Sequence, residues 1–417
     1  MTASQRAYGW AKYLNQFGYH PIILTRNWDH PIKTSADLVK STGKRLKTQR
    51  EKEYTVHYVP YKANTRDAIL RNPKASKFLK VFGKGLTFYE LIVQNFSIKV
   101  LPYSNLLVQA ERILQKEKVE AIVVTGNPFV LFQFGDVLSR TYDVPWIADY
   151  RDDWTTGEMT ERSSPLDKFL LTLERKSELK WLKSASCFTT ISSYYRDKIQ
   201  GLIQRQGHVL LNGFFQEKLE QYHPIEQLDQ FEIVYNGTLY ETQPIEIFLD
   251  GFRQFLEALP KAKRQRVQLT FLGLAFVPKQ AERVKEKLVG FEANFRITGR
   301  VDHGRALEYQ QKAAVLLMVA HQGVKGVPSS KIFEYFGLRK AVLLVNSDQD
   351  ILHNLVQGYN LGRIANHKDE VLTYLESSFA QYFEEGNLEA ADEDYVRQFN
   401  RSHQTKVLAE LIDKIVS

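Results

Sequence analysis

The chain has 417 residues, more than one hydrophobic core usually serves, so we expect two domains of roughly 200 residues each. Its composition is typical of a globular protein, and no run of about 20 apolar residues predicts a membrane-spanning helix. The single cysteine, Cys187, excludes a disulfide framework and a cysteine-based metal site. A net charge of +8 favours polyanionic partners, whether nucleic acid, anionic lipid or phosphorylated small molecules. The opening MTASQRAYGWAKYL lacks a secretory pattern, so the cytoplasm is the expected compartment.

Helices and strands are predicted to alternate along the whole chain. Apolar residues at helical spacing predict a helix from Tyr8 to Phe17, which Gly18 ends. In the first half, strands are expected at 21–25, 54–61, 119–125, 144–150, 186–191 and 208–211, with helices at 105–116, after Pro128, at 165–183 and from Ser193. In the second half, strands are expected at 231–239, 267–272, 295–298, 313–319 and 341–345, with helices at 245–258, 279–289, 304–312 and 330–338.

This alternation predicts an α/β fold of two tandem doubly wound, Rossmann-like domains that face each other across a ligand-binding cleft. The expected units are 1–212, 213–390 and a C-terminal helical segment at 391–417 that could cross back to the first unit. A doubly wound domain normally opens with its central strand and a glycine-rich turn, whereas this chain opens with a helix. We therefore expect the N-terminal domain to lack its first strand, and the natural product to begin upstream.

Charged residues follow the predicted strand at 144–150. Because α/β domains bind ligands at the carboxyl ends of strands, Asp149, Arg151 and Asp152 are candidate functional residues. The alternative is an arginine and an aspartate that pair with each other at the surface. The spacing of the aspartates, with no histidine nearby, argues against a metal site.

A glycine-containing loop at 323–330 leads into the predicted helix that begins at Lys331. Free N–H groups at the helix start and the lysine charge predict a phosphate site at Ser330 and Lys331. Glu334 suits ribose hydroxyls, because Phe333 rather than an acidic residue takes the capping-box position. An ordinary capped helix with a solvated glutamate is the alternative. Further candidates end neighbouring strands at the same sheet edge: Asn236, Gly237, Thr238, Arg300 and Val301.

The segment 72–101 is a basic amphipathic stretch. Lys74, Lys77, Lys80 and Lys84 alternate with aromatic and aliphatic residues. This pattern indicates either a helix that lies on an anionic membrane or a helix packed on its own domain with its lysines in water.

Together these segments resemble bacterial family-four glycosyltransferases, retaining enzymes of GT-B fold that assemble cell-surface polysaccharides. The resemblance covers Gln5 to Phe17, Asp149-Tyr150-Arg151-Asp152, Leu211-Asn212-Gly213, Tyr235-Asn236-Gly237-Thr238-Leu239 and Pro328–Tyr335. It implies that 1–212 binds the acceptor and that 213–390 binds the nucleotide sugar. Two features depart from the family: its first glutamate, which lies beside the donor sugar, falls on Gly326, and its usual basic pair falls on Thr238 and Gln243.

The resemblance also implies roles for the candidate residues. Lys331 would stabilise the departing diphosphate, and Arg151 and Asp152 would face it from the other domain. The implied nucleotide-sugar site comprises Asn236, Gly237, Thr238, Arg300, Val301, Ser330, Lys331 and Glu334, and the implied acceptor side comprises Gln5, Arg6 and Asp149.

The implied activity is retaining hexosyl transfer to a glycan or lipid-linked acceptor, with no metal or other cofactor. The expected partners are a nucleotide sugar, that acceptor and, through 72–101, the anionic inner face of the cell membrane, with no nucleic acid. Two alternatives stay open: a nucleotide-sugar epimerase of the same architecture, and a catalytically impaired nucleotide-sugar-binding protein.

Overall fold

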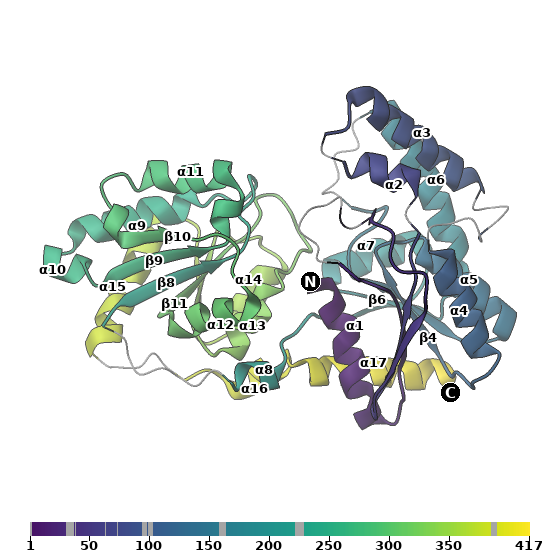
Figure 1. Cartoon of the computed structure of the whole chain (residues 1–417). Coiled ribbons are helices and arrows are strands. Elements are labelled where there is room, and N and C mark those ends of the chain that lie inside the picture. The colour runs from purple at the N-terminus through teal and green to yellow at the C-terminus, as the bar shows by residue number, and fades with distance from the viewer. Residues whose placement is uncertain are drawn as a thin grey trace.

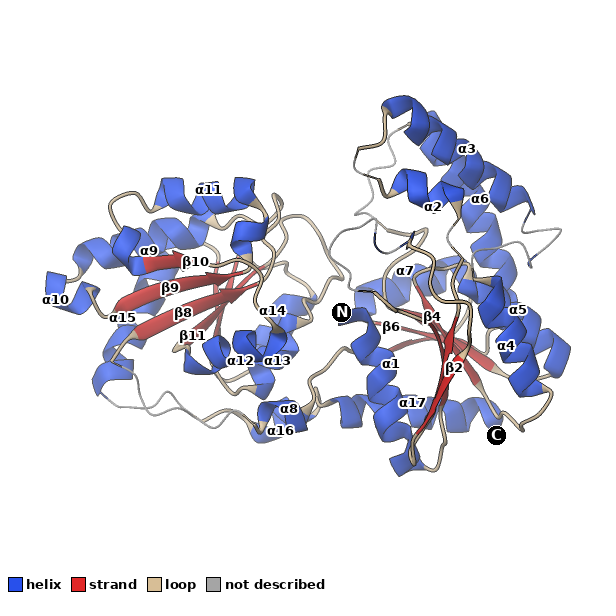
Figure 2. Ribbon diagram, in the orientation of Figure 1, coloured by secondary structure: helices blue, strands red, loops and turns tan. Residues whose placement is uncertain are grey.

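The computed structural model describes residues 2–417 except 31–36, 38, 63, 73, 94–97, 99–102, 158–163, 222–228 and 385–389. Helices and strands form two α/β units that lie side by side, one built from the first half of the chain and the other from the second (Figures 1 and 2). Among the described helices, none combines the length and the apolar character needed to cross a membrane.

The C-terminal unit is built on one parallel sheet with helices on both faces. Its strands are β8 (Phe231–Asn236), β9 (Val267–Leu272), β10 (Phe295–Ile297), β11 (Val315–Val319), β12 (Ala341–Val345) and β13 (Gly362–Ala365). Their order is β10-β9-β8-β11-β12-β13, and all neighbours are parallel. Because both faces are covered, β9, β11 and β12 are buried throughout, which explains the uninterrupted apolar sequences of β11 and β12.

Two apolar clusters fill the space between this sheet and its helices. One cluster includes residues of α9 (Glu246–Ala258), α11 (Pro278–Lys287) and α15 (Lys368–Glu384), and the other includes residues of α12 (His303–Lys312), α13 (Lys331–Gly337) and α14 (Ile351–Gln357). Shorter helices are α8 (Gln216–Leu219), α10 (Lys261–Arg264) and α16 (Glu393–Arg397). The doubly wound arrangement predicted for this half is confirmed.

The N-terminal unit contains two sheets instead of one. Its elements are α1 (Thr2–Tyr13), β1 (Ile22–Arg26), β2 (Lys47–Arg50), β3 (Thr55–Val59), α2 (Thr65–Leu70), α3 (Lys77–Val93), α4 (Ser104–Leu114), β4 (Ile122–Gly126), α5 (Leu131–Tyr142), β5 (Trp146–Tyr150), α6 (Pro165–Trp181), β6 (Cys187–Thr190), α7 (Ser193–Ile203) and β7 (Gly207–Val209). The sheets have the orders β1-β3-β2 and β4-β5-β6-β7. Strand β2 was not predicted and runs antiparallel to β3; its four residues are polar and exposed, so no apolar pattern marks it.

The two sheets of the N-terminal unit do not pair with each other along the described residues. Within the described part of the chain, no strand pairs with the free edge of β1 or of β4. The apolar residues of both strands are only half-buried, whereas those of β5 are fully buried. The N-terminal unit is thus divided into two sheets where a doubly wound domain has one continuous sheet.

The last helix, α17 (Arg401–Val416), packs against the N-terminal unit rather than the C-terminal one (Figure 1). Trp10 of α1, Leu14 just after it, and Leu408 and Leu411 of α17 belong to one apolar cluster, which also contains Ile147 of β5. The chain therefore crosses between the units twice, once after β7 and once before α17.

The two crossings are hydrogen-bonded to each other. The N–H of Phe214 donates to the carbonyl of Phe399 (3.1 Å), and the N–H of Arg401 donates to the carbonyl of Phe214 (2.9 Å). Gly213 permits this close approach, because a Cβ at residue 213 would lie 2.3 Å from the carbonyl oxygen of Phe399.

Replacing Gly213 tests the importance of this contact. Gly213→Ala is expected to lower the free energy of unfolding by about 1–3 kcal/mol, because two backbone segments must separate to admit the methyl group. Gly201→Ala in α7 is the matched control: its Cβ would meet nothing within 4 Å, so the same change should stabilise the helix by about 0.5–1 kcal/mol. Urea unfolding of both variants measures the difference. Equal stability of the two would show that the close approach at Gly213 does not limit stability.

Candidate functional site

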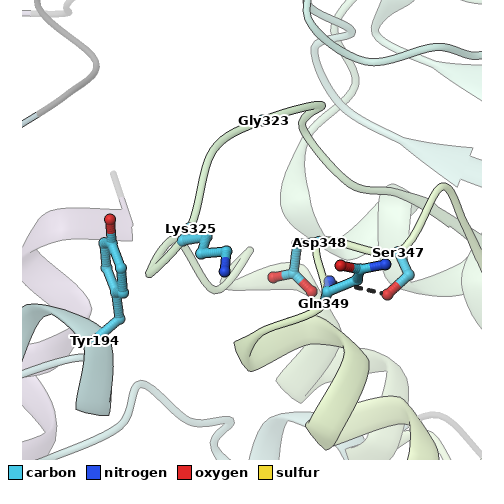
Figure 3. Close-up of a pocket in the computed structure, with 6 residues that line it drawn as sticks. All are labelled: Tyr194, Gly323, Lys325, Ser347, Asp348 and Gln349. Carbon is cyan, nitrogen blue, oxygen red and sulfur yellow. Dashed lines mark hydrogen bonds between the residues drawn. The ribbon is translucent and has the colours of Figure 1, made fainter.

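Loops at the carboxyl ends of the C-terminal strands face the N-terminal unit. The loop that follows β11 reaches α7, where a Cβ at Gly326 would lie 2.8 Å from Tyr194 and 2.9 Å from Tyr195. Figure 3 shows Tyr194 across from the part of this loop that carries Gly323 and Lys325. The sequence-predicted residues Gly237, Arg300 and Lys331 follow other strands of the sheet or continue this loop, so they lie along the edge that faces the other unit.

Lys331, the first residue of α13, extends across the end of β8. Its ammonium lies 5.3 Å from the centre of the Tyr235 ring, and a Cβ at Gly237 would lie 2.5 Å from its Nζ. None of the described carboxylates is within ion-pair distance of this nitrogen. Burial lowers the pKa of Lys331 to about 8, while nearby Glu334 acts in the opposite direction. The site thus holds a desolvated cation without a protein counter-ion, which favours an anionic ligand.

Glycine at 237 is required by both space and backbone. Its φ of +103° belongs to the left-handed half of conformational space, and the Lys331 side chain lies where a Cβ would stand. The flanking candidates are also at the strand end: Asn236 is the last residue of β8, and the carbonyl of Thr238 accepts from the Tyr235 hydroxyl at 3.0 Å.

Ser330 precedes α13 and makes no side-chain capping hydrogen bond. The helix has only seven residues, so we assign little of the anion attraction to its amino terminus and most of it to the Lys331 ammonium.

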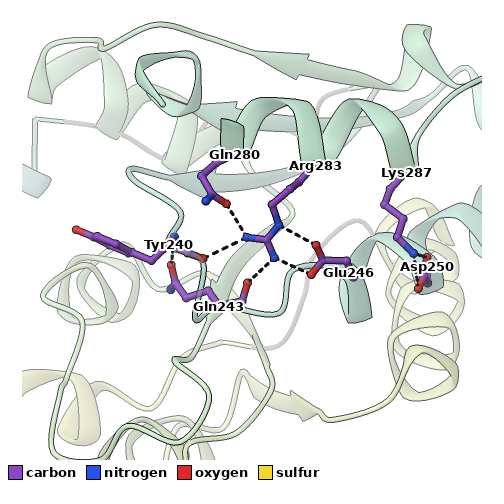
Figure 4. Close-up of polar contacts among 7 residues, drawn as sticks. All are labelled: Tyr240, Gln243, Glu246, Asp250, Gln280, Arg283 and Lys287. Carbon is purple, nitrogen blue, oxygen red and sulfur yellow. Dashed lines mark hydrogen bonds and ion pairs between the residues drawn. The ribbon is translucent and has the colours of Figure 1, made fainter. Parts of the chain in front are cut away.

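Arg283 of α11 supports the loop after β8 but has no donor left for a ligand (Figure 4). Its Nε and one terminal nitrogen each contact the Glu246 carboxylate at 2.8 Å. Its remaining contacts are with the Gln280 side chain (2.5 Å) and the carbonyls of Tyr240 (3.2 Å) and Gln243 (3.1 Å). All five N–H groups are therefore in use, and Arg283 cannot take the place of the basic pair that the sequence resemblance implies.

Gln243, one of the two residues that stand where the family usually carries a basic pair, is buried and structural. Its side-chain oxygen accepts from the N–H of Tyr240 (3.0 Å), and its amide nitrogen donates to the carbonyl of Val319 (2.6 Å). It therefore ties the loop after β8 to the end of β11.

Glu334 has a partner that the sequence did not reveal. His303, at the start of α12, contacts Glu334 Oε1 through Nε2 at 2.9 Å. The hydrogen bond to the carboxylate raises the pKa of His303. Glu334 is mostly buried and His303 is about half exposed, so the histidine orients the carboxylate from the solvent side.

Arg300 stacks on an exposed aromatic ring. Its guanidinium lies 3.6 Å from the centre of the Phe276 ring, and Phe276 is 54% exposed. Val301 is partly buried against the cluster that contains α12 and α13. The pair Arg300 and Phe276 offers a flat, cationic platform at the carboxyl edge of the sheet.

On the opposite unit, Arg6 and Asp149 form a closed, buried network. The side chains are 2% and 0% exposed, and Arg6 Nη2 lies 2.7 Å from Asp149 Oδ1. Arg6 also donates to the carbonyl of Leu210 (2.8 Å), and the Thr189 hydroxyl donates to Asp149 (2.7 Å). The network joins α1, β5, β6 and the crossing segment. Because both side chains are buried, they would act on an acceptor only through other residues, and their role in acceptor binding stays a prediction. Gln5, the third acceptor-side candidate, is half-buried on α1.

Arg151 and Asp152 contact each other. The Arg151 guanidinium forms an ion pair with the Asp152 carboxylate, and both side chains are partly exposed at the end of β5. This geometry matches the alternative of a self-paired arginine and aspartate, and their catalytic roles stay predictions.

Several solved structures have the same overall architecture as this chain over nearly its whole length. Sucrose-phosphate synthase from Thermosynechococcus elongatus matches with a TM-score of 0.60 at 13% identity, covering 97% of this chain and 91% of that one. A UDP-forming α,α-trehalose-phosphate synthase from Burkholderia vietnamiensis matches with a TM-score of 0.59 at 10% identity, covering 95% and 99%. The E. coli trehalose-6-phosphate structure bound with UDP-2-fluoro glucose matches with a TM-score of 0.59 at 11% identity, covering 95% and 99%.

The chain has the GT-B fold. The predicted resemblance to retaining GT-B glycosyltransferases is thereby confirmed at the level of the fold. No protein-family model and no curated protein sequence matches the chain.

The N-terminal half of this GT-B fold carries a buried acid that the sequence reading missed. Glu178 of α6 accepts hydrogen bonds from the hydroxyls of Tyr150 (2.7 Å) and Thr155, next to the Arg151 and Asp152 pair. Burial raises the pKa of Glu178 to about 7. The sequence does contain a sign of this buried acid: Glu178 lies three positions before the buried Trp181, so helical spacing puts its carboxylate on the apolar face of α6.

The raised pKa makes stability depend on pH. Since Glu178 ionises at pH 4.5 in the unfolded chain but near pH 7 in the fold, its contribution is complete below pH 4.5 and is lost as the pH rises through 7. Relative to the parent, Glu178→Gln should therefore gain up to about 3 kcal/mol of unfolding free energy between these limits. Urea unfolding of both proteins below pH 4.5 and above pH 7 measures this. Glu376→Gln, at an exposed site on α15, is the control, and a parallel pH response of all three proteins would show the prediction to be wrong.

Proposed function

We propose that this protein is a retaining glycosyltransferase that moves a sugar from a nucleoside-diphosphate donor to a glycan or lipid-linked acceptor. The observation that carries the proposal is the uncompensated, desolvated Lys331 ammonium at the cleft-facing edge of a GT-B sheet. A UDP-forming synthase and a protein bound with UDP-2-fluoro glucose share the fold, which supports a nucleoside diphosphate as the leaving group.

In this proposal the sugar–phosphate bond breaks as the acceptor hydroxyl oxygen attacks from the same face, and the hydroxyl proton passes to the departing diphosphate. Negative charge grows on the departing diphosphate, and Lys331 stabilises that charge in a setting where water screens it poorly. Lys331 therefore takes the part that a metal ion plays elsewhere. Glu334, held by His303, binds the ribose hydroxyls, and Arg151 adds positive charge from the opposite unit while Asp152 orients it.

The acceptor is proposed to be membrane-associated, in line with a role in cell-surface polysaccharide assembly. Helix α3 carries large apolar side chains that point into solvent, among them Phe78 (80% exposed), Val81 (62%) and Tyr89 (62%). Its inner face packs on α2 through Gly83, and Phe88 meets Phe169 of α6 with ring centres 6.0 Å apart. Exposed apolar surface of this kind indicates a binding surface.

The basic residues beside that surface favour an anionic membrane as its partner. Lys77 and Lys80 are exposed on α3, whereas Lys84 pairs with Asp167 of α6 at 2.7 Å and so helps hold α3 in place. Residues 73, 94–97 and 99–101 of the predicted segment lie outside the described residues. We propose that α3 gives reversible attachment to the inner face of the cell membrane.

The nucleotide site is tested by two variants that predict different patterns. Lys331→Ala should weaken nucleoside-diphosphate and pyrophosphate binding by about 1.5–3 kcal/mol, because a charge-assisted contact is lost. Glu334→Gln should weaken nucleoside and nucleoside-diphosphate binding while leaving pyrophosphate binding unchanged. Calorimetry with all three ligands measures both, and Lys312→Ala, at the other edge of the sheet, is the control.

The pH response adds a second readout. Diphosphate affinity of the parent should fall as the pH rises through 8, because Lys331 loses its charge while the ligand stays fully ionised. Lys331→Ala should lack this decrease. If the variant binds the diphosphate as tightly as the parent, the phosphate site lies elsewhere. Product analysis with and without acceptor then separates glycosyl transfer from epimerisation and from binding without turnover.

Membrane attachment is tested with vesicles that contain anionic lipid. Phe78→Ser with Val81→Ser should reduce co-sedimentation at every salt concentration, since each buried apolar side chain contributes about 1.5–3 kcal/mol. Lys77→Gln with Lys80→Gln should cost about 2 kcal/mol and remove most of the salt dependence. The pair Lys261→Gln and Lys263→Gln, on α10 at the far end of the C-terminal unit, is the charge control (Figure 1). Equal sedimentation of all variants would exclude α3 as the membrane surface.

A further inference from the structure

A pocket of about 420 Å³ lies between the two units, and Lys331 is not among its lining residues. One wall is Tyr194 of α7, and the other walls come from two loops of the C-terminal unit (Figure 3). Its lining residues are Tyr194, Gly323, Lys325, Ser347, Asp348 and Gln349. The volume is in the range of small-molecule sites, which is roughly 300–1,000 Å³.

The pocket is lined by one cation, Lys325, and one carboxylate, Asp348. Asp348 is committed to the backbone, because it accepts from the N–H groups of Asp350 (3.1 Å), Leu352 (3.0 Å) and His353 (2.9 Å). Lys325 is exposed between Tyr194 and the loop at 347–349, and it has no ion-pair partner in the described part of the chain (Figure 3). The ammonium is thus the one lining charge whose hydrogen-bonding capacity is unused.

The loop after β12 is held in a strained shape that presents a second polar group. Asn346 and Gln349 have φ values of +58° and +49°, which non-glycine residues adopt at a cost. Ser347 Oγ accepts from the N–H of Gln349 (3.0 Å) and contacts His353 Nδ1 (2.8 Å), so the loop is fixed from within. The Gln349 side chain itself is exposed and makes no hydrogen bond to any described residue.

We propose that this pocket binds a sugar that carries an anionic group, either a carboxylate or a phosphate. Lys325 pairs with the anion, and the Gln349 amide and the Tyr194 side chain contact hydroxyls and the sugar ring. The inference rests on the proposed glycosyltransferase function, and it specifies that one of the sugar substrates is negatively charged. Because both units line the pocket, its occupancy would also favour the closed position of the two units.

The test compares matched neutral and charged sugars by saturation-transfer NMR and calorimetry. Glucose, glucuronate, glucose 6-phosphate and inorganic phosphate are titrated into the parent, Lys325→Gln, Gln349→Ala and the control Lys263→Gln. At least one charged sugar should bind the parent and the control about tenfold more tightly than glucose, as expected for one charge-assisted contact. Lys325→Gln should abolish that preference, and Gln349→Ala should weaken glucose and charged sugars by a similar factor.

The two anions identify the chemistry, since a preference confined to glucuronate indicates a carboxylate and one confined to glucose 6-phosphate indicates a phosphate. Lys331→Ala should keep the preference, which separates this pocket from the diphosphate site. Equal affinity for glucose and both charged sugars, or a preference that survives in Lys325→Gln, overturns the proposal. A nucleoside diphosphate is titrated in parallel: if it fails to bind the parent, the proposed function fails, whereas normal nucleotide binding without a sugar preference overturns the pocket alone.

Discussion

The relative position of the two units depends on the backbone contact where the chain crosses between them twice. Residues 213–214 and 399–401 run side by side, and the carbonyl of Phe399 occupies the space that a side chain at 213 would need. Arg401 follows at once and is almost fully buried beside Gly9 and the Phe215 ring. Burial lowers the pKa of Arg401 to about 10, which records the cost of enclosing a guanidinium there. A change in the relative position of the two units therefore requires these two connecting segments to move together.

The cations singled out in the two units differ in whether the protein itself pairs them. Arg6 and Arg283 are saturated by carboxylates and carbonyls, so they fix the shape of the loops. Lys331 and Lys325 lack such partners among the described residues, so their ammonium groups can pair with an anionic ligand. The two kinds of cation cannot be told apart by composition. They differ in whether a carboxylate from another element reaches them, which depends on tertiary packing.

The sequence predicted the buried strands well because parallel strands covered on both faces are continuous apolar runs, as at 315–319 and 341–345. It missed β2, whose four exposed polar residues are strand only because β3 pairs with them. The loop into α13 identified Lys331, since a loop that runs into a helix is a local pattern. The partners of the site residues, such as His303 beside Glu334, come from other strand ends and follow from the strand order. For Arg151 and Asp152 the sequence fits both a functional pair and a self-paired arginine and aspartate, because their ion pair depends on side-chain geometry.

The departure from the family at Gly326 has a physical explanation. Its φ is +78°, and a Cβ there would meet the rings of Tyr194 and Tyr195 within 3 Å, so a glutamate at this position would force the loop away from α7. The Gly326 N–H instead donates to Asp350 (2.6 Å), which draws the loop toward the end of β12. Lys325 stands beside this glycine and is exposed, so the loop carries a cation and no carboxylate at 325 and 326. Glycine at 326 therefore lets this loop approach Tyr194 and Tyr195 of the other unit, with the Lys325 ammonium beside the contact.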